Sequence, residues 1–171
     1  MILNIEPEMV TKLEDSMQRM AFRITESAAS TYTQESKTTP VVPELKQAMV
    51  IHKIVMRLSR GVRANAGVTD AHGGINKRSF DAEPDFDDAD IIFQMRGNSI
   101  FLTATGEPDY CHAMIKEVDY EPHPLVYVKR NIYAYSRAIA STATQNTEID
   151  IFYTVAQLSD KDWIAAISEG L

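Results

Sequence analysis

The sequence predicts a mostly β protein, an antiparallel β-sandwich or barrel with a helix near each end of the chain. Candidate strands number about seven to nine, and turn signals separate them by about ten residues. Helical periodicity occurs only near the two ends of the chain. No region alternates strands with helices, which argues against a doubly wound α/β enzyme fold.

The first predicted element is an amphipathic helix over residues 7–23, in which apolar residues recur at spacings of three and four after Pro7. Residues 24–44 are rich in Ser and Thr and lack a helical period, so we expect an extended arm or edge strand that ends in a loop. The predicted organisation is a helix-and-arm segment, residues 1–44, followed by a β-sandwich with a C-terminal helix, residues 45–171.

The β-region is predicted to begin with one long strand over residues 45–59, which is apolar and rich in β-branched residues. Residues 60–79 contain four glycines and little periodicity, so we expect a long loop. Arg96-Gly97-Asn98 suits a hairpin turn between two apolar runs, residues 90–95 and 99–105.

The last third of the chain carries the clearest strand signal. Residues 111–121 alternate weakly, and residues 125–141 suit one long strand or two. Residues 147–158 alternate strictly and predict a strand with two distinct faces. A short helix should follow, with Ser159 as its N-cap and Gly170 at its end.

Composition is that of one ordinary globular domain: 171 residues, 44% hydrophobic and 24% charged, with a net charge of −7. The acidic balance argues against nucleic-acid binding by the whole molecule. Residues 1–80 carry 11 Lys and Arg against 8 Asp and Glu, whereas residues 81–171 carry 6 against 16. Either separate surfaces for separate partners or chance variation among solvated loops explains this split.

No apolar run approaches the roughly 20 residues that a membrane span needs, so no membrane span is expected. The N-terminus lacks both the basic start and the apolar stretch of a secretion signal. We therefore expect the mature chain to begin near Met1, inside a cell.

Motifs that name a reaction are absent, so no enzyme activity is predicted. Cys111 is the single cysteine, and its neighbour His112 should point to the opposite face of a strand, so the two cannot form a nucleophile–base pair. We expect His52 to be a hydrogen-bonded core or interface residue. His72 should be solvated in a loop, and His123 should lie in a turn.

The stretch DAEPDFDDAD, residues 81–90, concentrates six carboxylates. It does not fit an EF-hand, because neither the turn glycine nor the terminal glutamate falls at its required offset. Two interpretations remain open. One is a solvated loop that keeps the following strand from edge pairing. The other is a calcium site, in which four carboxylates would be the ligands: Asp85, Asp87, Asp88 and Asp90. No cofactor besides this calcium is expected.

The order of the elements resembles that of single jelly-roll coat proteins of small icosahedral viruses. The resemblance covers about residues 25–160 and is one of pattern, carried by TTPVVPELKQAMVIHKIVMRLS, NIYAYSRAIAS and TEIDIFYTVAQLS. It implies eight strands in two facing sheets and an arm that reaches neighbouring subunits. It also implies self-assembly into a homo-oligomeric shell, a location in the virion and synthesis in the host cytoplasm. It transfers no catalytic residues.

In such a shell, we expect one set of residues to face the genome and another to form subunit contacts. An arm that packages nucleic acid is usually basic, but residues 1–11 contain two Glu and neither Lys nor Arg. The alternative residues to face a viral genome are the basic side chains around the glycine-rich segment: Arg57, Arg60, Arg63, Lys77 and Arg78. Subunit contacts would fall on the predicted helix, at Met9, Leu13, Met17 and Met20.

Two other functions fit the predicted sandwich. One is a jelly-roll module that binds carbohydrate or another ligand, with exposed Tyr133 and Tyr135 and the acidic stretch lining a calcium-containing site. The other is a cupin-like metalloenzyme. The sequence contains no His-x-His, so imidazole ligands would have to come from isolated histidines.

Overall fold

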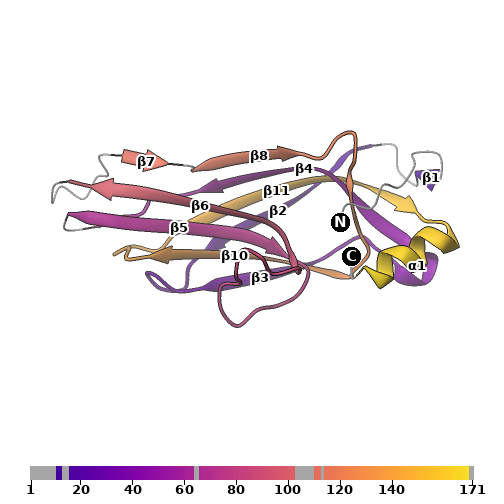
Figure 1. The fold of residues 1–171 in the computed structure, drawn as a ribbon, viewed down its shortest axis with the longest axis horizontal. Helices are drawn as coiled ribbons and strands as arrows, with labels where there is room; N and C mark the ends of the chain where they lie inside the picture. The colour runs from indigo at the N-terminus through magenta and orange to yellow at the C-terminus, as the bar shows by residue number, and fades with distance from the viewer. Residues whose placement is uncertain (1–10, 13–15, 64–65, 103–109, 113, 170–171) are drawn as a thin grey trace.

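The computed structural model describes residues 11–12, 16–63, 66–102, 110–112 and 114–169. These residues form an elongated sandwich of two antiparallel sheets with one helix, α1 (Asp160–Ser168), at one end (Figure 1). The sheet that we call sheet A consists of β1 (Thr11–Lys12), β2 (Gln18–Thr25), β4 (Gln47–Leu58), β8 (Ile115–Asp119), β9 (Leu125–Tyr127) and β11 (Asn146–Gln157). Sheet B consists of β3 (Thr33–Thr38), β5 (Gly67–Asn76), β6 (Ile91–Phe101), β7 (Tyr110–His112) and β10 (Asn131–Ile139).

The chain passes repeatedly between the two sheets, so each sheet is built from segments far apart in the sequence. In sheet A, β11 lies between β2 and β4, and β8 and β9 pair with the other edge of β4. Sheet B has the order β3-β10-β5-β6-β7. This is the Greek-key arrangement of a jelly roll, so the predicted fold class is confirmed.

The core lies between the sheets because each long strand alternates. Along β11, Ile149, Ile151 and Tyr153 face the core, whereas Asp150 points away from it. The sheets approach each other closely at Gly73, where an added Cβ would lie 2.8 Å from the Leu58 side chain. Sheet B contributes these buried apolar residues: Ala71, Ile75, Phe93, Met95, Ile132 and Ala134.

The N-terminal helix prediction is wrong where the structure describes it, because residues 18–25 form strand β2. Met20 packs against the core, and Phe22 and Ile24 are fully or nearly fully buried. Of the predicted contact residues, Met17 is exposed. Met9 and Leu13 lie outside the described residues. The last residues of this segment alternate between buried and exposed positions, as in a strand, and they pair with β11. This pairing outweighs the apolar spacing of three and four that suggested a helix.

The Ser- and Thr-rich segment forms the edge strand β3, one of the two predicted alternatives. Each sheet therefore contains strands that precede residue 44 in the chain and strands that follow it. Between β3 and β4, a short 3-10 helix, η2 (Pro43–Leu45), precedes Lys46, whose φ is 53°.

The predicted glycine-rich loop is also wrong, because residues 67–76 form a strand between β10 and β6. Glycine weakens strand propensity in isolation, but tertiary packing requires it here: a Cβ on Gly74 would lie 2.3 Å from the Tyr135 ring. The predicted hairpin turn at residues 96–98 lies inside the unbroken strand β6 for a related reason. Its partner β5 offers a ladder along the whole length of that strand.

The C-terminal helix forms as predicted from its N-cap to Ser168, and its predicted end at Gly170 lies outside the described residues. Ser159 caps it by accepting a hydrogen bond from the Asp162 backbone N–H at 3.2 Å. Trp163 and Ala166 pack on a small second core at the end of the sandwich, formed by Ala48, Val126, Val128 and Leu158. Within the described ranges, no helix has both the length and the apolar character needed to cross a membrane.

Candidate functional site

The outer face of each sheet carries one nearly buried carboxylate surrounded by three basic side chains. Glu83 occupies this position on sheet B, and Asp150 occupies it on sheet A. The side chain of each is only 6% exposed. A buried carboxylate needs paired charges and hydrogen bonds, so these two clusters organise the polar surfaces of the sandwich.

Residues 77–90, which we call the acidic loop, connect β5 to β6 and lie across the outer face of sheet B (Figure 1). The Lys77 backbone N–H donates to the Asp90 carbonyl at 2.7 Å and closes the base of the loop. The Phe80 backbone N–H donates to the Gln34 side chain on β3 at 2.9 Å. The loop therefore spans the sheet from β6 to its edge strand.

Glu83 fastens the middle of the acidic loop to the sheet. Its carboxylate lies 2.5 Å from His72 Nδ1, 3.0 Å from Arg137 Nη1 and 3.4 Å from Arg96 Nη2. The strand register places Arg137, His72 and Arg96 in one row across β10, β5 and β6. The carboxylate thus sits above three basic groups that the ladder has already aligned.

Electrostatics favours the ionised form of Glu83. Burial raises the pKa of this carboxyl group, but the hydrogen bond with His72 and the charges of His72, Arg96 and Arg137 lower it by more. The net pKa lies below its ordinary value. At neutral pH, the acidic loop is therefore held to the sheet by a charged and hydrogen-bonded contact.

Two tyrosines form an aromatic floor beside this contact. Tyr135 is fully buried, its ring lies 5.4 Å from that of Tyr32, and its hydroxyl accepts a hydrogen bond from Gln94. Burial raises the pKa of Tyr32 to about 12, and the charges of Glu83 and Asp81 add to the effect. The sugar-binding interpretation required an exposed Tyr135 and is wrong on that point, because the ring is covered.

The predicted calcium ligands divide into two groups. Asp85 and Asp87 are exposed, whereas Asp90 and Asp88 lie 2.5 and 3.5 Å from the Arg78 guanidinium. In the described part of the chain, no group of three or more His, Cys, Asp or Glu side chains lies close enough to hold a metal ion. Calcium binding by the acidic stretch stays a prediction, because the described residues of one chain form no cluster of ligands for it.

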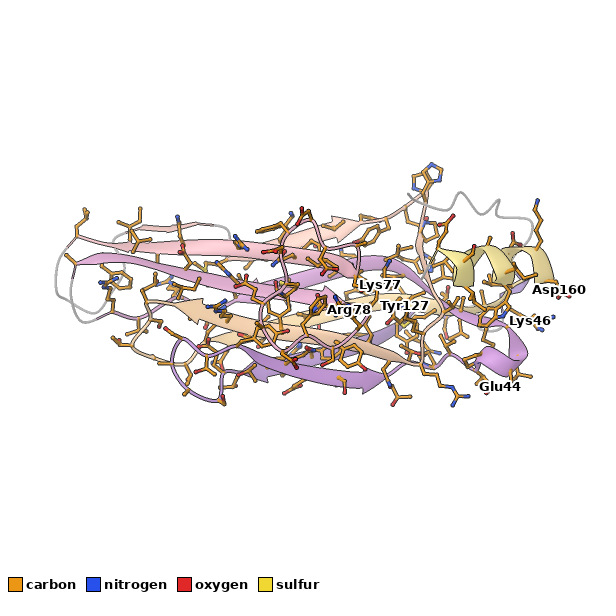
Figure 2. All side chains as sticks on the ribbon, turned by 60° about the horizontal axis from the view of Figure 1, so that its bottom comes forward. Glu44, Lys46, Lys77, Arg78, Tyr127 and Asp160 are labelled. Carbon is orange, nitrogen blue, oxygen red and sulfur yellow. The ribbon has the colours of Figure 1, made fainter. Side chains whose placement is uncertain are left out.

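The basic residues that were expected to face a genome are not gathered on one surface. Arg57 lies on the outer face of sheet A, where it pairs with Asp150. Arg63 donates to the Val68 carbonyl at the start of β5, whereas Lys77 and Arg78 follow the end of the same strand (Figure 2). Arg60 is exposed just after β4. A genome-facing role for this set stays a prediction.

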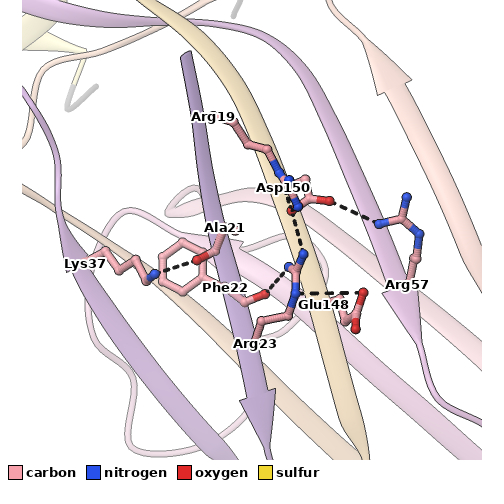
Figure 3. A network of polar contacts seen from close by, with 8 residues as sticks. All are labelled: Arg19, Ala21, Phe22, Arg23, Lys37, Arg57, Glu148 and Asp150. Atoms are coloured by element: carbon pink, nitrogen blue, oxygen red, sulfur yellow. Dashed lines mark hydrogen bonds and ion pairs between the residues drawn. The ribbon is translucent and has the colours of Figure 1, made fainter.

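Asp150 lies at the centre of the second cluster (Figure 3). Arg19 and Arg23 reach it from β2 at 2.8 and 3.1 Å, and Arg57 reaches it from β4 at 3.1 Å. Its direct cross-strand neighbours are Ala21 and Val55, whose small side chains leave room for the guanidinium groups. Burial raises the pKa of the Asp150 carboxyl group, but hydrogen bonds from the three arginines lower it by more, so the net pKa lies below its ordinary value.

His52 forms a third polar group, on sheet A where a β-bulge shifts the register of β4 against β11. Its Nε2 lies 2.9 Å from Thr154 Oγ1, and its Nδ1 contacts Glu121. The hydroxyl–imidazole–carboxylate order is that of a hydrolase triad. Thr154 is only 7% exposed, so its hydroxyl offers little surface to a substrate. The group therefore ties Glu121 to the sheet, and the prediction of a hydrogen-bonded His52 is confirmed.

Sequence reasoning missed the Glu83 cluster and placed His72 wrongly in a solvated loop. His72 is 5% exposed on a central strand. Glu83 lies 11, 13 and 54 residues away in the chain from its three partners, so no local pattern links them. The one available signal is weak: Glu83 is the single glutamate among five aspartates in the acidic stretch.

Comparisons with known proteins agree with this architecture. No protein-family model matches the chain, and no curated protein matches it in sequence. VP1 of Trichodysplasia spinulosa-associated polyomavirus is structurally similar, with a TM-score of 0.51 at 6% identity, over 88% of this chain and 99% of that chain. Two further solved structures have lower scores. The tomato aspermy virus structure has a TM-score of 0.42 at 9% identity, over 84% of this chain and 80% of that one. The Desmodium yellow mottle tymovirus structure has a TM-score of 0.33 at 12% identity, over 84% and 90%.

The match to VP1 shows a shared fold, and it extends over nearly all of both chains. The resemblance in element order to viral coat proteins is thereby confirmed at the level of the fold. This chain has the viral jelly-roll fold, with two antiparallel sheets facing each other and one short helix at the end.

Proposed function

We propose that this chain is a structural, non-enzymatic subunit that assembles with copies of itself into the capsid of a virus. The observation that carries the proposal is the fold shared with a polyomavirus VP1 over 88% of this chain and 99% of that one. In this proposal the chain is made in the cytoplasm of a host cell and ends in the virion.

Exposed apolar side chains support self-assembly. Leu102 after β6 and Ile115 on β8 are 61% and 68% exposed. On α1, Ile164 and Ile167 point away from the small core that Trp163 and Ala166 cover, and they are 67% and 54% exposed. Large apolar groups at separate places on a rigid sandwich suit contacts with several neighbours.

Assembly of the purified chain tests the proposal. Size-exclusion chromatography with light scattering, followed by negative-stain electron microscopy, should show discrete particles in at least one condition across a range of salt, calcium and chelator. A chain that stays monomeric in every condition would contradict it. Particles that survive chelation unchanged would separately exclude a bridging calcium at Asp85, Asp87, Asp88 and Asp90.

The nucleic-acid content of the particles tests the second predicted partner, a viral genome. If the exposed basic residues face a genome, particles should show a raised ratio of absorbance at 260 nm to that at 280 nm. Replacing Arg60 and Arg63 by glutamate should then lower the ratio. Asp160→Asn on α1, far from both residues along the chain, serves as the control. An unchanged ratio in the arginine variant would remove these two residues from the genome-facing set.

A further inference from the structure

We propose that the outer face of sheet A is a docking surface for the acidic loop of a second copy of this chain. Arg19, Arg23 and Arg57 of one copy would receive Asp85 and Asp87 of the next, with Phe86 between the two carboxylates. The inference rests on the proposed self-assembly and specifies two surfaces that would meet.

The arginine cluster offers more hydrogen-bond donors than its own chain uses. Three guanidinium groups converge on one carboxylate, and their side chains remain 43–51% exposed. Arg57 contacts Asp150 through Nη1 alone. A guanidinium carries several N–H donors in a planar fork, so donors remain to face outward. Asp150 holds the three groups in place, which lowers the entropy lost when they bind a partner.

Charge within the arginine cluster also favours an acidic partner. The three arginines stand against Asp150 and Glu148, the latter 3.9 Å from Arg23 and 48% exposed. Farther along the face, Lys53 is paired with Glu117 at 2.5 Å and lies opposite the exposed Asp119 in the strand register, so that part of the face has no positive surplus. The cluster itself, three arginines with Asp150 and Glu148, thus keeps an excess of one positive charge among the residues that the structure describes.

The acidic loop presents a complementary surface on the other side of the sandwich. Asp81, Asp85 and Asp87 are exposed, and none of them has an ion-pair partner among the residues that the structure describes. Phe86 is 54% exposed, and its ring is stacked on Arg96 at 4.0 Å. Because Glu83 fastens the loop to sheet B, these side chains are held in a fixed position rather than on a free segment.

Each surface also combines charged groups with an exposed apolar side chain. On the loop, an aromatic ring stands between two carboxylates. On the sheet, Ile115 of β8 lies beside Arg57 in the strand register and is 68% exposed, so one apolar side chain adjoins the cluster on its β8 side. Paired carboxylates suit bidentate contacts with arginine, and Phe and Arg are both enriched in protein interfaces.

The placement of the surfaces determines the kind of assembly. The arginine face belongs to sheet A and the acidic loop to sheet B, so one copy uses different surfaces toward its two neighbours. Such a heterologous contact generates a ring if the rotation between neighbours closes and an open filament if it does not, rather than a two-fold dimer.

Charge reversal in the full chain tests the contact. The loop variant Asp85→Arg/Asp87→Arg and the face variant Arg23→Glu/Arg57→Glu should each raise the protein concentration needed for assembly at least tenfold. A chain that carries all four substitutions should recover assembly with itself, because the attraction is restored with reversed signs. The control Glu35→Arg/Glu169→Arg changes net charge as much as the loop variant does, at exposed positions outside both surfaces, and should assemble normally.

Wild-type assembly by the loop variant would overturn the inference, whatever the face variant does. The loop residues are exposed, so their substitution does not threaten the fold, and circular dichroism checks each variant. If the loop variant assembles normally while the face variant loses bound nucleic acid, the face binds a genome, and the inference is wrong.

Association between copies without particle formation would contradict the proposed function but not the contact. If wild-type chain forms no particles, sedimentation equilibrium still measures association between copies. Association that both variants abolish and the four-fold variant restores would support the contact without a shell. A wild-type chain that is strictly monomeric at the highest attainable concentration overturns both proposals.

Discussion

Glu83 and Asp150 have the same chemistry but different structural consequences. Each is a carboxylate that is 6% exposed, with three basic partners and a lowered pKa. Glu83 belongs to a loop, and its charge contacts hold that loop to sheet B. Asp150 belongs to a strand whose backbone is already paired on both sides. A buried carboxylate on a loop therefore determines the local structure, because no strand pairing fixes the backbone there. On a paired strand, it mainly orients the side chains at the surface.

The largest expected effect is that of Glu83→Ala. The substitution leaves His72, Arg96 and Arg137 without their anion and removes the central attachment of the acidic loop, so we expect a loss of about 2–4 kcal/mol in the free energy of unfolding. Urea denaturation measures this loss, and limited proteolysis should show new cleavage within residues 77–90. Asp87→Ala, on the same loop but exposed, should change stability by less than about 0.5 kcal/mol. Equal midpoints and identical cleavage for the two variants would refute the attachment role.

A smaller effect is expected for Asp150→Asn. The strands stay paired and the arginines remain accessible to water, so the loss should be about 1–2 kcal/mol, with no new cleavage in the acidic loop. Glu148→Gln is the matched control, because Glu148 is half exposed and should contribute little. A larger loss for Asp150→Asn than for Glu83→Ala would reverse the comparison between the two clusters.

The pH dependence of stability provides a third test. Both carboxyl groups have folded pKa values below their ordinary values of 4.5 and 3.8. A depressed pKa means that the stabilisation is present above the unfolded pKa and is lost as the pH falls through the folded pKa. Wild-type stability should therefore decline below about pH 4.5, whereas Glu83→Gln should decline less over the same range. Parallel curves for the two proteins between pH 3 and 7 would show that Glu83 does not carry this dependence.

The smallest expected effect is that of Tyr135→Phe beneath the acidic loop. Gln94 would lose the hydroxyl that accepts its hydrogen bond, at a cost of about 1 kcal/mol, while Glu83 would still hold the loop. Denaturation should show the small loss, and proteolysis should show no new cleavage in the loop. Loop cleavage in this variant would mean that the aromatic floor, rather than the Glu83 contact, fastens the loop.

Elements with a strong local signal were predicted well. Strict alternation in residues 147–158 predicted β11, and Ser159 with the acids after it predicted the start of α1. Prediction failed where tertiary packing opposed the local signal. Residues 18–23 carry apolar spacing that also suits a helix, and Gly73 and Gly74 suggested a loop although close packing against Leu58 and Tyr135 requires them in β5.

Local pattern was therefore sufficient for the fold class, because alternation and end caps act over a few neighbouring residues. The two charged clusters depended on the tertiary structure. Glu83 meets partners 11, 13 and 54 residues away, and Asp150 meets partners 93 to 131 residues away. Such contacts exist only after distant strands pair in one register, and that pairing is stabilised by the shared core rather than by the charged residues themselves.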